Sequence, residues 1–268
     1  MPDNVKTFRD LHKGTPLLRL PNAWDAGSAA LIARLGATAI ASSSAGVAWA
    51  LGYPDGRVLP IDEAIGAAAR IVRVVTVPVT VDIENGYSDD PRTVADNVMR
   101  LVELRVAGIN IEDGPDKPTI LAAKIDAIRN VVSKAGSDLF INARTDVFLA
   151  SLVEKPRLVE ESVARANLYT RSGADGIFLP GVSTPADIKA VVASISLPLN
   201  VIALPGLTDA EALGKLGVRR LSAGSGIAQV LWAKVEELAK DFLETGRSDS
   251  FGESSMPYRQ IQSLFSKK

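Results

Sequence analysis

Acidic side chains and one arginine follow successive apolar runs in the middle of this 268-residue chain. Asp82 and Glu84 come at the end of one run, Glu112 ends the next, and Arg144 ends the one after that. Carboxylate oxygens suit Mg²⁺ or Mn²⁺, which bind through one or two carboxylates together with water and substrate oxygens. A single acidic pair could be explained without a metal, because such residues often cap a loop or form ion pairs with nearby Lys or Arg. Acidic groups after two adjacent runs, with Arg144 beside them, favour a metal site.

Two interpretations of Arg144 are open. Its guanidinium could stabilise negative charge that develops on a substrate oxygen, as a preorganised donor does. It could equally hold the scaffold together through an ion pair with Asp146 or another neighbouring carboxylate.

The small residues Ser43, Ser44, Ala45 and Gly46 follow an earlier apolar run. Their hydroxyls and exposed backbone N–H groups could hold a carboxylate, as backbone nests hold anions. A tight turn between strand and loop would explain the same residues.

The residue types that the chain lacks narrow its chemistry. It has no Cys and one His, His12, which excludes a disulfide framework, a Cys/His zinc site and nearly every His-based triad. Its 30 basic and 31 acidic residues leave a net charge of −1, so we expect no general attraction to nucleic acid or to a membrane. No apolar stretch approaches the ~20 residues of a membrane span, and the polar N-terminal segment does not resemble a signal peptide. We therefore expect a cytoplasmic protein.

Eight short β-rich runs, separated by helix-like segments, must position these side chains. Most are continuously apolar, which is typical of parallel strands covered on their outer face. The expected strands span residues 17–20, 37–42, 77–82, 108–111, 139–143, 176–179, 199–203 and 220–223. The expected helices span residues 26–35, 62–74, 90–107, 120–135, 160–172, 184–195, 208–216 and 227–245.

Eight β-then-α units predict a (β/α)₈ TIM barrel over residues 1–246. A doubly wound open sheet is the alternative, but the Gly-rich turn that normally follows its first strand is missing here. Residues 247–268 form a partly apolar tail, which we expect to pack on the barrel or on a neighbouring subunit. A barrel places its active site at the carboxyl ends of its strands, where Asn200 of the seventh strand would join the residues named above.

Four stretches together resemble the isocitrate lyase/phosphoenolpyruvate mutase superfamily, from Leu17 to about Leu243. They are residues 22–28 (NAWDAGS), residues 43–55 (SSAGVA followed by LGYPD), the pair DIE at 82–84 with IEDG at 111–114, and residues 142–146 (NARTD). The resemblance is stronger to the oxaloacetate decarboxylase and phosphonopyruvate branch than to the true isocitrate lyases.

This resemblance implies a barrel whose eighth helix swaps between paired subunits, usually in a dimer of dimers. It also implies a role for each matching residue: Mg²⁺ on Asp82, Glu84 and Glu112, largely through water; the carboxylate of a 2-oxo acid on Ser43, Ser44 and Ala45; Asp55 lining the site; and Arg144 on the developing enolate oxygen.

The chain departs from the family pattern in its loops. The family's lyases carry a Lys-Cys-Gly-His segment on a long loop after the fourth strand, whereas residues 115–120 are short and contain no Cys. This argues against cleavage of isocitrate or methylisocitrate. The metal motif reads Asp-x-Glu where most relatives have Asp-x-Asp, and the sixth strand ends in Pro180 and Gly181, without the Glu that the lyases use for a larger substrate.

We therefore expect a Mg²⁺-dependent lyase that cleaves or decarboxylates a small, oxaloacetate-like 2-oxo acid through a pyruvate enolate. Phosphonopyruvate chemistry, by a P–C bond mutase or hydrolase, is the alternative within the family. Two other classes remain open: a non-catalytic 2-oxo-acid binding protein, and a barrel that binds a sugar phosphate at residues 224–226. Apolar residues along 227–243 predict a homo-oligomer, expected to be a tetramer.

Overall fold

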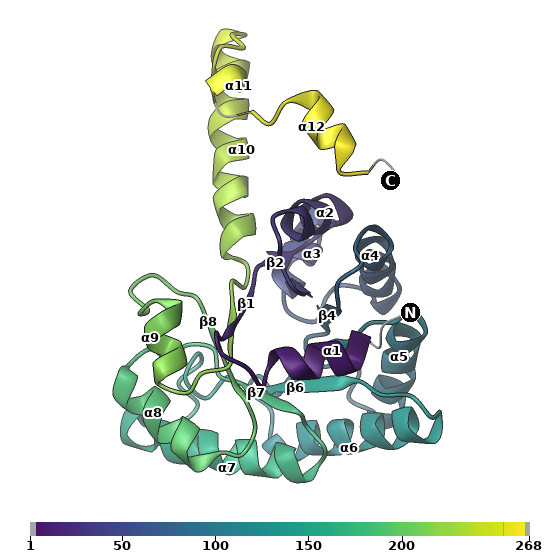
Figure 1. The fold of residues 1–268 in the computed structure, drawn as a ribbon, viewed down its shortest axis with the longest axis vertical. Coiled ribbons are helices and arrows are strands. Elements are labelled where there is room, and N and C mark those ends of the chain that lie inside the picture. Colours follow the sequence, from purple (N-terminus) through teal and green to yellow (C-terminus); the bar gives the residue numbers. More distant parts are fainter. Residues whose placement is uncertain (1–3, 254, 266–268) are drawn as a thin grey trace.

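Parallel strands follow one another around a barrel in the computed structural model, which describes residues 4–253 and 255–265 (Figure 1). The first barrel strand is divided at Pro21: its first half pairs with the last strand and its second half with the next strand along the chain, which closes the ring. The strands are β1 (Leu18–Leu20), β2 (Asn22–Ala23), β3 (Ile40–Ser42), β4 (Val79–Asp82), β5 (Gly108–Glu112), β6 (Phe140–Arg144), β7 (Gly176–Phe178), β8 (Leu199–Ile202) and β9 (Arg220–Ser222). The predicted (β/α)₈ barrel is confirmed.

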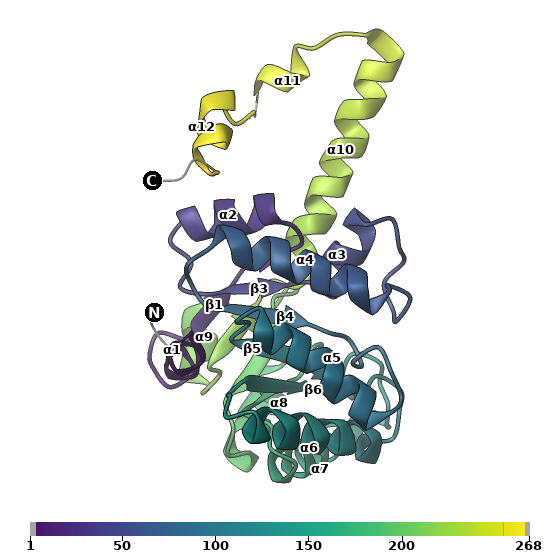
Figure 2. The ribbon, with the colours of Figure 1, turned by 90° about the vertical axis from the view of Figure 1, so that its right-hand side faces the viewer.

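Helices alternate with the strands and cover the outside of the barrel (Figure 2). Residues that favour a helix start precede three of them: the Asp25 side chain caps α2, and Asp90 and Thr184 each cap a helix that has Pro at its first position. The helices on the barrel are α2 (Ala26–Arg34), α4 (Ile61–Val74), α5 (Pro91–Glu103), α6 (Pro118–Lys134), α7 (Leu158–Arg171), α8 (Pro185–Ser194) and α9 (Ala210–Lys215), with a short 3₁₀ turn at Lys155–Arg157. Within residues 4–246, two α-helices were not predicted: α1 (Asn4–Leu11) and α3 (Ser44–Ala50).

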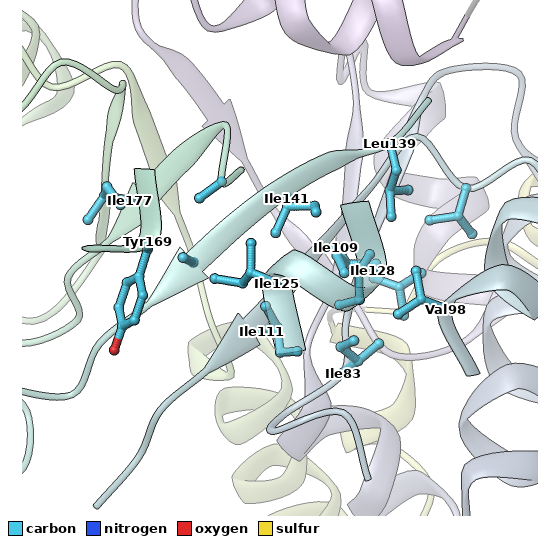
Figure 3. Packing of buried hydrophobic residues seen from close by; sticks show 14 of the residues in the cluster. Ile83, Val98, Ile109, Ile111, Ile125, Ile128, Leu139, Ile141, Tyr169 and Ile177 are labelled. Atoms are coloured by element: carbon cyan, nitrogen blue, oxygen red, sulfur yellow. The ribbon is translucent and has the colours of Figure 1, made fainter. Parts of the chain in front are cut away.

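The main core lies between the strands and the helices that cover them. Figure 3 shows Ile109, Ile111 and Ile141 packed near Ile125 and Ile128 of α6, and all five side chains are fully buried. Because successive strand residues point to opposite faces, these isoleucines leave the alternate positions facing the barrel interior. Polar residues occupy several of those interior positions, and this arrangement brings them together.

The amino-terminal helix α1 covers the end of the barrel where the strands begin. Phe8 of α1 is completely buried and packs with Leu18, Leu20 and Phe140. The ring of His12 stacks on Phe140, with ring centroids 4.2 Å apart. His12 is thus a structural residue, at the end of the barrel opposite to the carboxyl ends of the strands.

The last long helix, α10 (Gly226–Thr245), extends away from the barrel in both views (Figures 1 and 2). Beyond it, α11 (Ser250–Glu253) and α12 (Tyr258–Ser263) turn back towards the barrel, and Arg34 of α2 donates hydrogen bonds to Gln260 O and Ser263 Oγ. Residues 254 and 266–268 of the predicted tail lie outside the described residues. Among the helices described, none combines the length and the apolar character that crossing a membrane requires.

Replacing Phe8 with Ala should destabilise the protein strongly, because the deleted ring leaves a cavity in a closed part of the core. Truncation of a buried Phe typically costs about 3–5 kcal/mol. Urea denaturation of the Phe8→Ala protein measures this loss, with Leu35→Ala on the exposed end of α2 as the control. A loss below about 1 kcal/mol would show that α1 is not part of the cooperative fold.

Candidate active site

A cavity of about 260 Å³ opens at the carboxyl ends of the barrel strands. Most of the predicted site residues line it: Ser43, Ser44, Ala45, Asp55, Asp82 and Arg144. Gly224 and Ser225, from the stretch considered above for a sugar phosphate, also line the cavity. The remaining lining residues were not predicted: Asn22, Asn110, Leu149, Phe178, Pro180, Ile202, Leu204 and Ser222. The strand ends of the barrel therefore bring together residues that lie up to about 200 positions apart in sequence.

The small residues after β3 form the start of a helix and not the tight turn that was the alternative interpretation. Ser43 is the N-cap of α3, and its Oγ accepts a hydrogen bond from the Gly46 N–H at 3.2 Å. The first N–H groups of a helix have no acceptor within the helix. Ser44 and Ala45 occupy these positions and also line the cavity, so this end of α3 can donate hydrogen bonds to an anionic group.

Arg144 lies between two carboxylates at the mouth of the barrel. Its Nε and Nη2 donate to the two oxygens of Asp146 at 2.7 and 3.0 Å, and Nη1 lies 2.7 Å from Glu112 Oε2. Glu112 and Arg144 are register partners on the neighbouring strands β5 and β6. A guanidinium has five N–H groups, so these contacts leave two of them for a ligand in the cavity. The geometry supports the scaffold interpretation and leaves room for the catalytic one.

Five carboxylates lie close together in this part of the barrel, and their pKa values reflect an excess of negative charge: Asp55, Asp82, Glu84, Glu112 and Asp146. Burial raises the pKa of Asp55, and the charge of Asp82 raises it further. Burial raises the pKa of Glu112 to about 8, against the opposing effect of Arg144, and Asp82 and Asp146 add to the rise. Burial likewise raises the pKa of Glu84. Each of these pKa values would fall if a cation were bound among the carboxylates.

Glu84 and Glu112 are not among the residues that line the cavity. The backbone N–H of Arg57 donates to Glu84 Oε2, which ties the loop after α3 to the end of β4. Glu84 Oε1 is buried and has no hydrogen-bond donor among the described residues. A buried acceptor of this kind calls for a partner such as water or a cation.

Asn200 lies below the cavity, inside the barrel, where it belongs to a layer of hydrogen-bonded polar side chains. Asn142 donates to Asn110 at 2.9 Å and to Asn200 at 3.1 Å, and Asn200 in turn donates to Ser222 Oγ. Asn110 also donates to Asp82 Oδ2 at 3.1 Å. This layer therefore supports Asp82 and Ser222, which do line the cavity. The sequence signal that could have predicted this polar layer is a polar residue in the middle of an otherwise apolar strand.

Arg220 is the cation of this layer and is completely buried. It donates to Asn110 Oδ1 at 3.2 Å and to Ser222 Oγ at 3.1 Å. Burial lowers its pKa, while the charge of Asp82 raises it. Arg220 thus supplies positive charge beneath the carboxylates of the cavity.

Asp113, the residue after Glu112, fixes the loop that carries Asp146. Its Oδ1 accepts from the Asp146 N–H at 3.1 Å, while Oδ2 accepts from Arg165 at 2.8 Å and from the Tyr169 hydroxyl at 2.5 Å. Asp113 is 1 % exposed, so all these bonds are shielded from water. Helix α7 thereby holds Asp146, which in turn orients Arg144.

The residues present fit a divalent cation held largely through water. Asp82, Glu84 and Glu112 supply hard oxygen ligands, Glu84 has an unpartnered buried oxygen, and the local charge is negative. Among the described residues, no three acidic, His or Cys side chains are close enough together to bind one ion directly. Mg²⁺ usually keeps several of its waters, which is compatible with this spacing.

The comparison with known proteins places the chain within one family. The family model described as phosphoenolpyruvate phosphomutase matches residues 8–243. The chain is 39% identical to an uncharacterized protein of Mycobacterium tuberculosis over 82% of each chain. It is 32% identical to the oxaloacetate decarboxylase of Pseudomonas entomophila, over 79% of this chain and 75% of that protein. A crystal structure from Burkholderia cenocepacia J2315, provisionally assigned as a phosphonomutase, is 38% identical, with a TM-score of 0.84 over 89% of this chain and 99% of that one.

Mg²⁺ should raise the melting temperature more at pH 8 than at pH 5. The folded protein holds protons on Glu84 and Glu112 more tightly than the unfolded chain does, because their folded pKa values are raised. The free energy of unfolding therefore falls as the pH rises from about 4.5, the unfolded value, towards the folded values. A cation replaces the lost protons at pH 8 and competes with them at pH 5.

Differential scanning fluorimetry with Mg²⁺ or with a chelator measures this effect. Glu84→Gln should shrink the Mg²⁺-dependent shift, whereas Glu103→Gln on the exposed end of α5 should preserve it. Equal shifts at both pH values, or no shift at pH 8, would contradict a cation among these carboxylates.

Proposed function

The chain belongs to the phosphoenolpyruvate phosphomutase family, and we propose that it is a Mg²⁺-dependent carbon–carbon lyase that acts on a small 2-oxo acid through an enolate. The family match confirms the resemblance carried by the four sequence stretches. Membership also identifies the chain as an enzyme of the lyase and mutase type. The metal, the substrate and the residue roles below are the proposal.

The observation that carries the proposal is the position of Arg144. Two carboxylates hold its guanidinium, and it faces a cavity that also contains helix-start N–H groups. A 2-oxo acid presents a carboxylate and a neighbouring oxo oxygen. The start of α3 can bind the carboxylate, and the free N–H groups of Arg144 can donate to the oxo oxygen.

In this binding mode, the chain stabilises charge that develops as the bond to C3 breaks. The electron pair of that bond moves into the enolate, and negative charge grows on the oxo oxygen beside Arg144. Glu112 and Asp146 keep the guanidinium in place, so little reorganisation is needed during the reaction. A Mg²⁺ ion held by Asp82, Glu84 and Glu112 would supply a Lewis acid for the same oxygens.

Asp55 is the proposed proton donor. It lies in the loop after α3, lines the cavity, and has a pKa raised by burial and by Asp82. A carboxyl that keeps its proton at higher pH can deliver it to C3 of the enolate. This assigns general acid chemistry to a chain that has no Cys.

The short loop after β5 argues against larger substrates. Only residues 113–117 separate β5 from α6, and Asp116 is tied to Arg57 by an ion pair of 3.0 Å. An oxaloacetate-like acid fits this small site better than a methylisocitrate.

Phosphonopyruvate is the alternative, supported by the Burkholderia relative. Turnover of these compounds, followed by NMR with Mg²⁺ and with chelator, distinguishes them. Absence of turnover would indicate a binding protein. A cytoplasmic location stays a prediction.

Replacing Arg144 with Ala should lower kcat by about 10²–10³-fold and leave KM nearly unchanged, because the donor acts mainly on the transition state. Arg144→Lys should not restore the rate, since Lys lacks the planar fork that meets both carboxylates. Steady-state kinetics on the substrate that the panel identifies tests this, with Arg100→Ala on the surface as the control.

The melting temperature should fall in the Arg144→Ala protein under either interpretation, because Glu112 and Asp146 lose their partner. The value of kcat therefore decides. A less stable protein with normal kcat would assign Arg144 to the scaffold alone.

We also propose that a second copy of the chain covers α10, in keeping with the swapped helix and the tetramer that the resemblance implies. Large apolar side chains project from this helix along its length, with Val230 70 % and Leu243 84 % exposed. Ala228 is its one buried residue among those described. A monomeric enzyme would leave this surface in water.

Light scattering should find an oligomer at micromolar concentration, expected to be a tetramer. A charge on the exposed apolar surface, as in Val235→Glu, should shift the protein towards smaller species, whereas Glu236→Gln on the same helix should not. A wild-type protein that is monomeric under these conditions would refute the assembly.

A further inference from the structure

A lysine occupies the apolar face of α6. Lys124 is 1 % exposed and follows the same helical spacing as Leu121, Ile125 and Ile128, which are buried in the core (Figure 3). A lysine is almost never fully buried unless a partner compensates for its charge. The proposed reaction makes no use of Lys124, so its position on this face calls for another explanation.

The partner of Lys124 is a backbone carbonyl in a loop. Its Nζ donates to Asn85 O at 2.9 Å, and this is its one hydrogen bond among the described residues. Asp89 and Asp116 attract the ammonium from nearby and Arg57 repels it. Asn85 is itself buried, so its carbonyl depends on a donor from the protein. The long side chain of Lys124 allows α6 to supply that donor.

Asn85 belongs to a strained turn at the end of β4. The Gly86 N–H donates to Ile83 O at 2.7 Å, which closes a turn over residues 83–86. Within this turn Glu84 has a φ of +49°, in the left-handed region that suits glycine and disfavours other residues. Such a conformation persists only where the surrounding structure holds it.

Three successive carbonyls of the turn accept hydrogen bonds from three different elements. Glu84 O accepts from the last N–H of β5 at 2.8 Å. Asn85 O accepts from Lys124 of α6, and Gly86 O accepts from Asn97 Nδ2 of α5 at 3.2 Å. Lys124 therefore supplies the middle one of the three bonds that hold the turn in place.

The turn determines where the Glu84 carboxylate lies. Its Oε2 accepts from the Arg57 N–H, and its buried Oε1 has no donor among the described residues. Glu84 is close to Asp82 and Glu112. The free oxygen is thus available within the group of carboxylates.

We propose that Lys124 is a positioning residue, which holds the turn at residues 83–86 and thereby keeps the Glu84 carboxylate in the proposed cation site. The inference rests on the proposed function, because it assigns Lys124 to the site of the divalent cation. Lys124 is not itself a ligand and acts through the backbone of Asn85. Removing a group that orients a metal ligand from outside typically weakens metal binding by about 10–100-fold.

Replacing Lys124 with Met removes the donor and keeps an unbranched side chain. Mn²⁺ should bind about tenfold more weakly to this variant, measured by electron paramagnetic resonance of the free ion. The same substitution at the exposed end of α6, Lys134→Met, should leave the affinity unchanged. Val132→Ala, a buried truncation near that end, should lower the melting temperature and also leave the affinity unchanged. If Lys124→Met does not fold, Lys124→Gln, with its shorter side chain, takes its place.

Two further measurements separate positioning from a general loss of stability. In a Glu84→Gln background, Lys124→Met should weaken Mn²⁺ binding by less than about twofold, because both changes remove the same contribution. Without metal, the backbone amides of residues 83–87 should exchange with deuterium faster in Lys124→Met than in the wild-type protein. The same amides should stay protected in Val132→Ala.

Three results would each overturn the inference: an unchanged Mn²⁺ affinity in Lys124→Met, effects of the two substitutions that multiply in the double variant, or unchanged exchange at residues 83–87. If the wild-type protein binds no Mn²⁺, the cation of the proposed function fails. Hydrogen exchange then decides by itself whether Lys124 holds the turn.

Discussion

The ion cluster of Glu112, Arg144 and Asp146 is the interaction on which the site depends. Arg144 contacts both carboxylates at 2.7 Å, at the barrel mouth where water is largely excluded. Leaving either carboxylate unpaired there would be strongly unfavourable. The cluster fixes the direction of the guanidinium, and with it the place where an anionic oxygen can bind. Asp113 and α7 secure the cluster from behind through buried hydrogen bonds.

The interior of the barrel supports this cluster at a distance. A layer of Asn side chains and the buried Arg220 lies between the apolar plug at Phe8 and the carboxylates above. Successive side chains along a strand point alternately outward and into the barrel. Hydrogen bonds within the layer satisfy most of the polar groups that point inward. Positive charge below and negative charge above give the barrel a polar axis that ends in the cavity. Burial and repulsion among neighbouring carboxylates raise the carboxyl pKa values at the cavity, whereas positive charge beneath them opposes that rise.

Local sequence signals predicted the fold well, because apolar runs and Pro or Asp helix starts act over a few residues. The eight strands and the helices that follow them lie close to the expected ranges. The helix at Ser44–Ala50 was missed because its small residues also suit a turn, and α1 because its single buried ring contacts distant strands. The pattern of strand ends pointed to Arg144, and the resemblance pointed to Asp55; both line the cavity. It could not show that Asn200 lies below the cavity, or that Leu204 and Leu149 face it, since loop packing decides both.

The carboxylates around Arg144 should form a site for one divalent cation. Titration of Mn²⁺ at pH 8, followed by electron paramagnetic resonance of the free ion, measures this directly. We expect one bound Mn²⁺ per chain, displaced by Mg²⁺ and lost in an Asp82→Asn protein that remains folded. Mn²⁺ that stays free at millimolar concentration, or binding that survives Asp82→Asn unchanged, would contradict it.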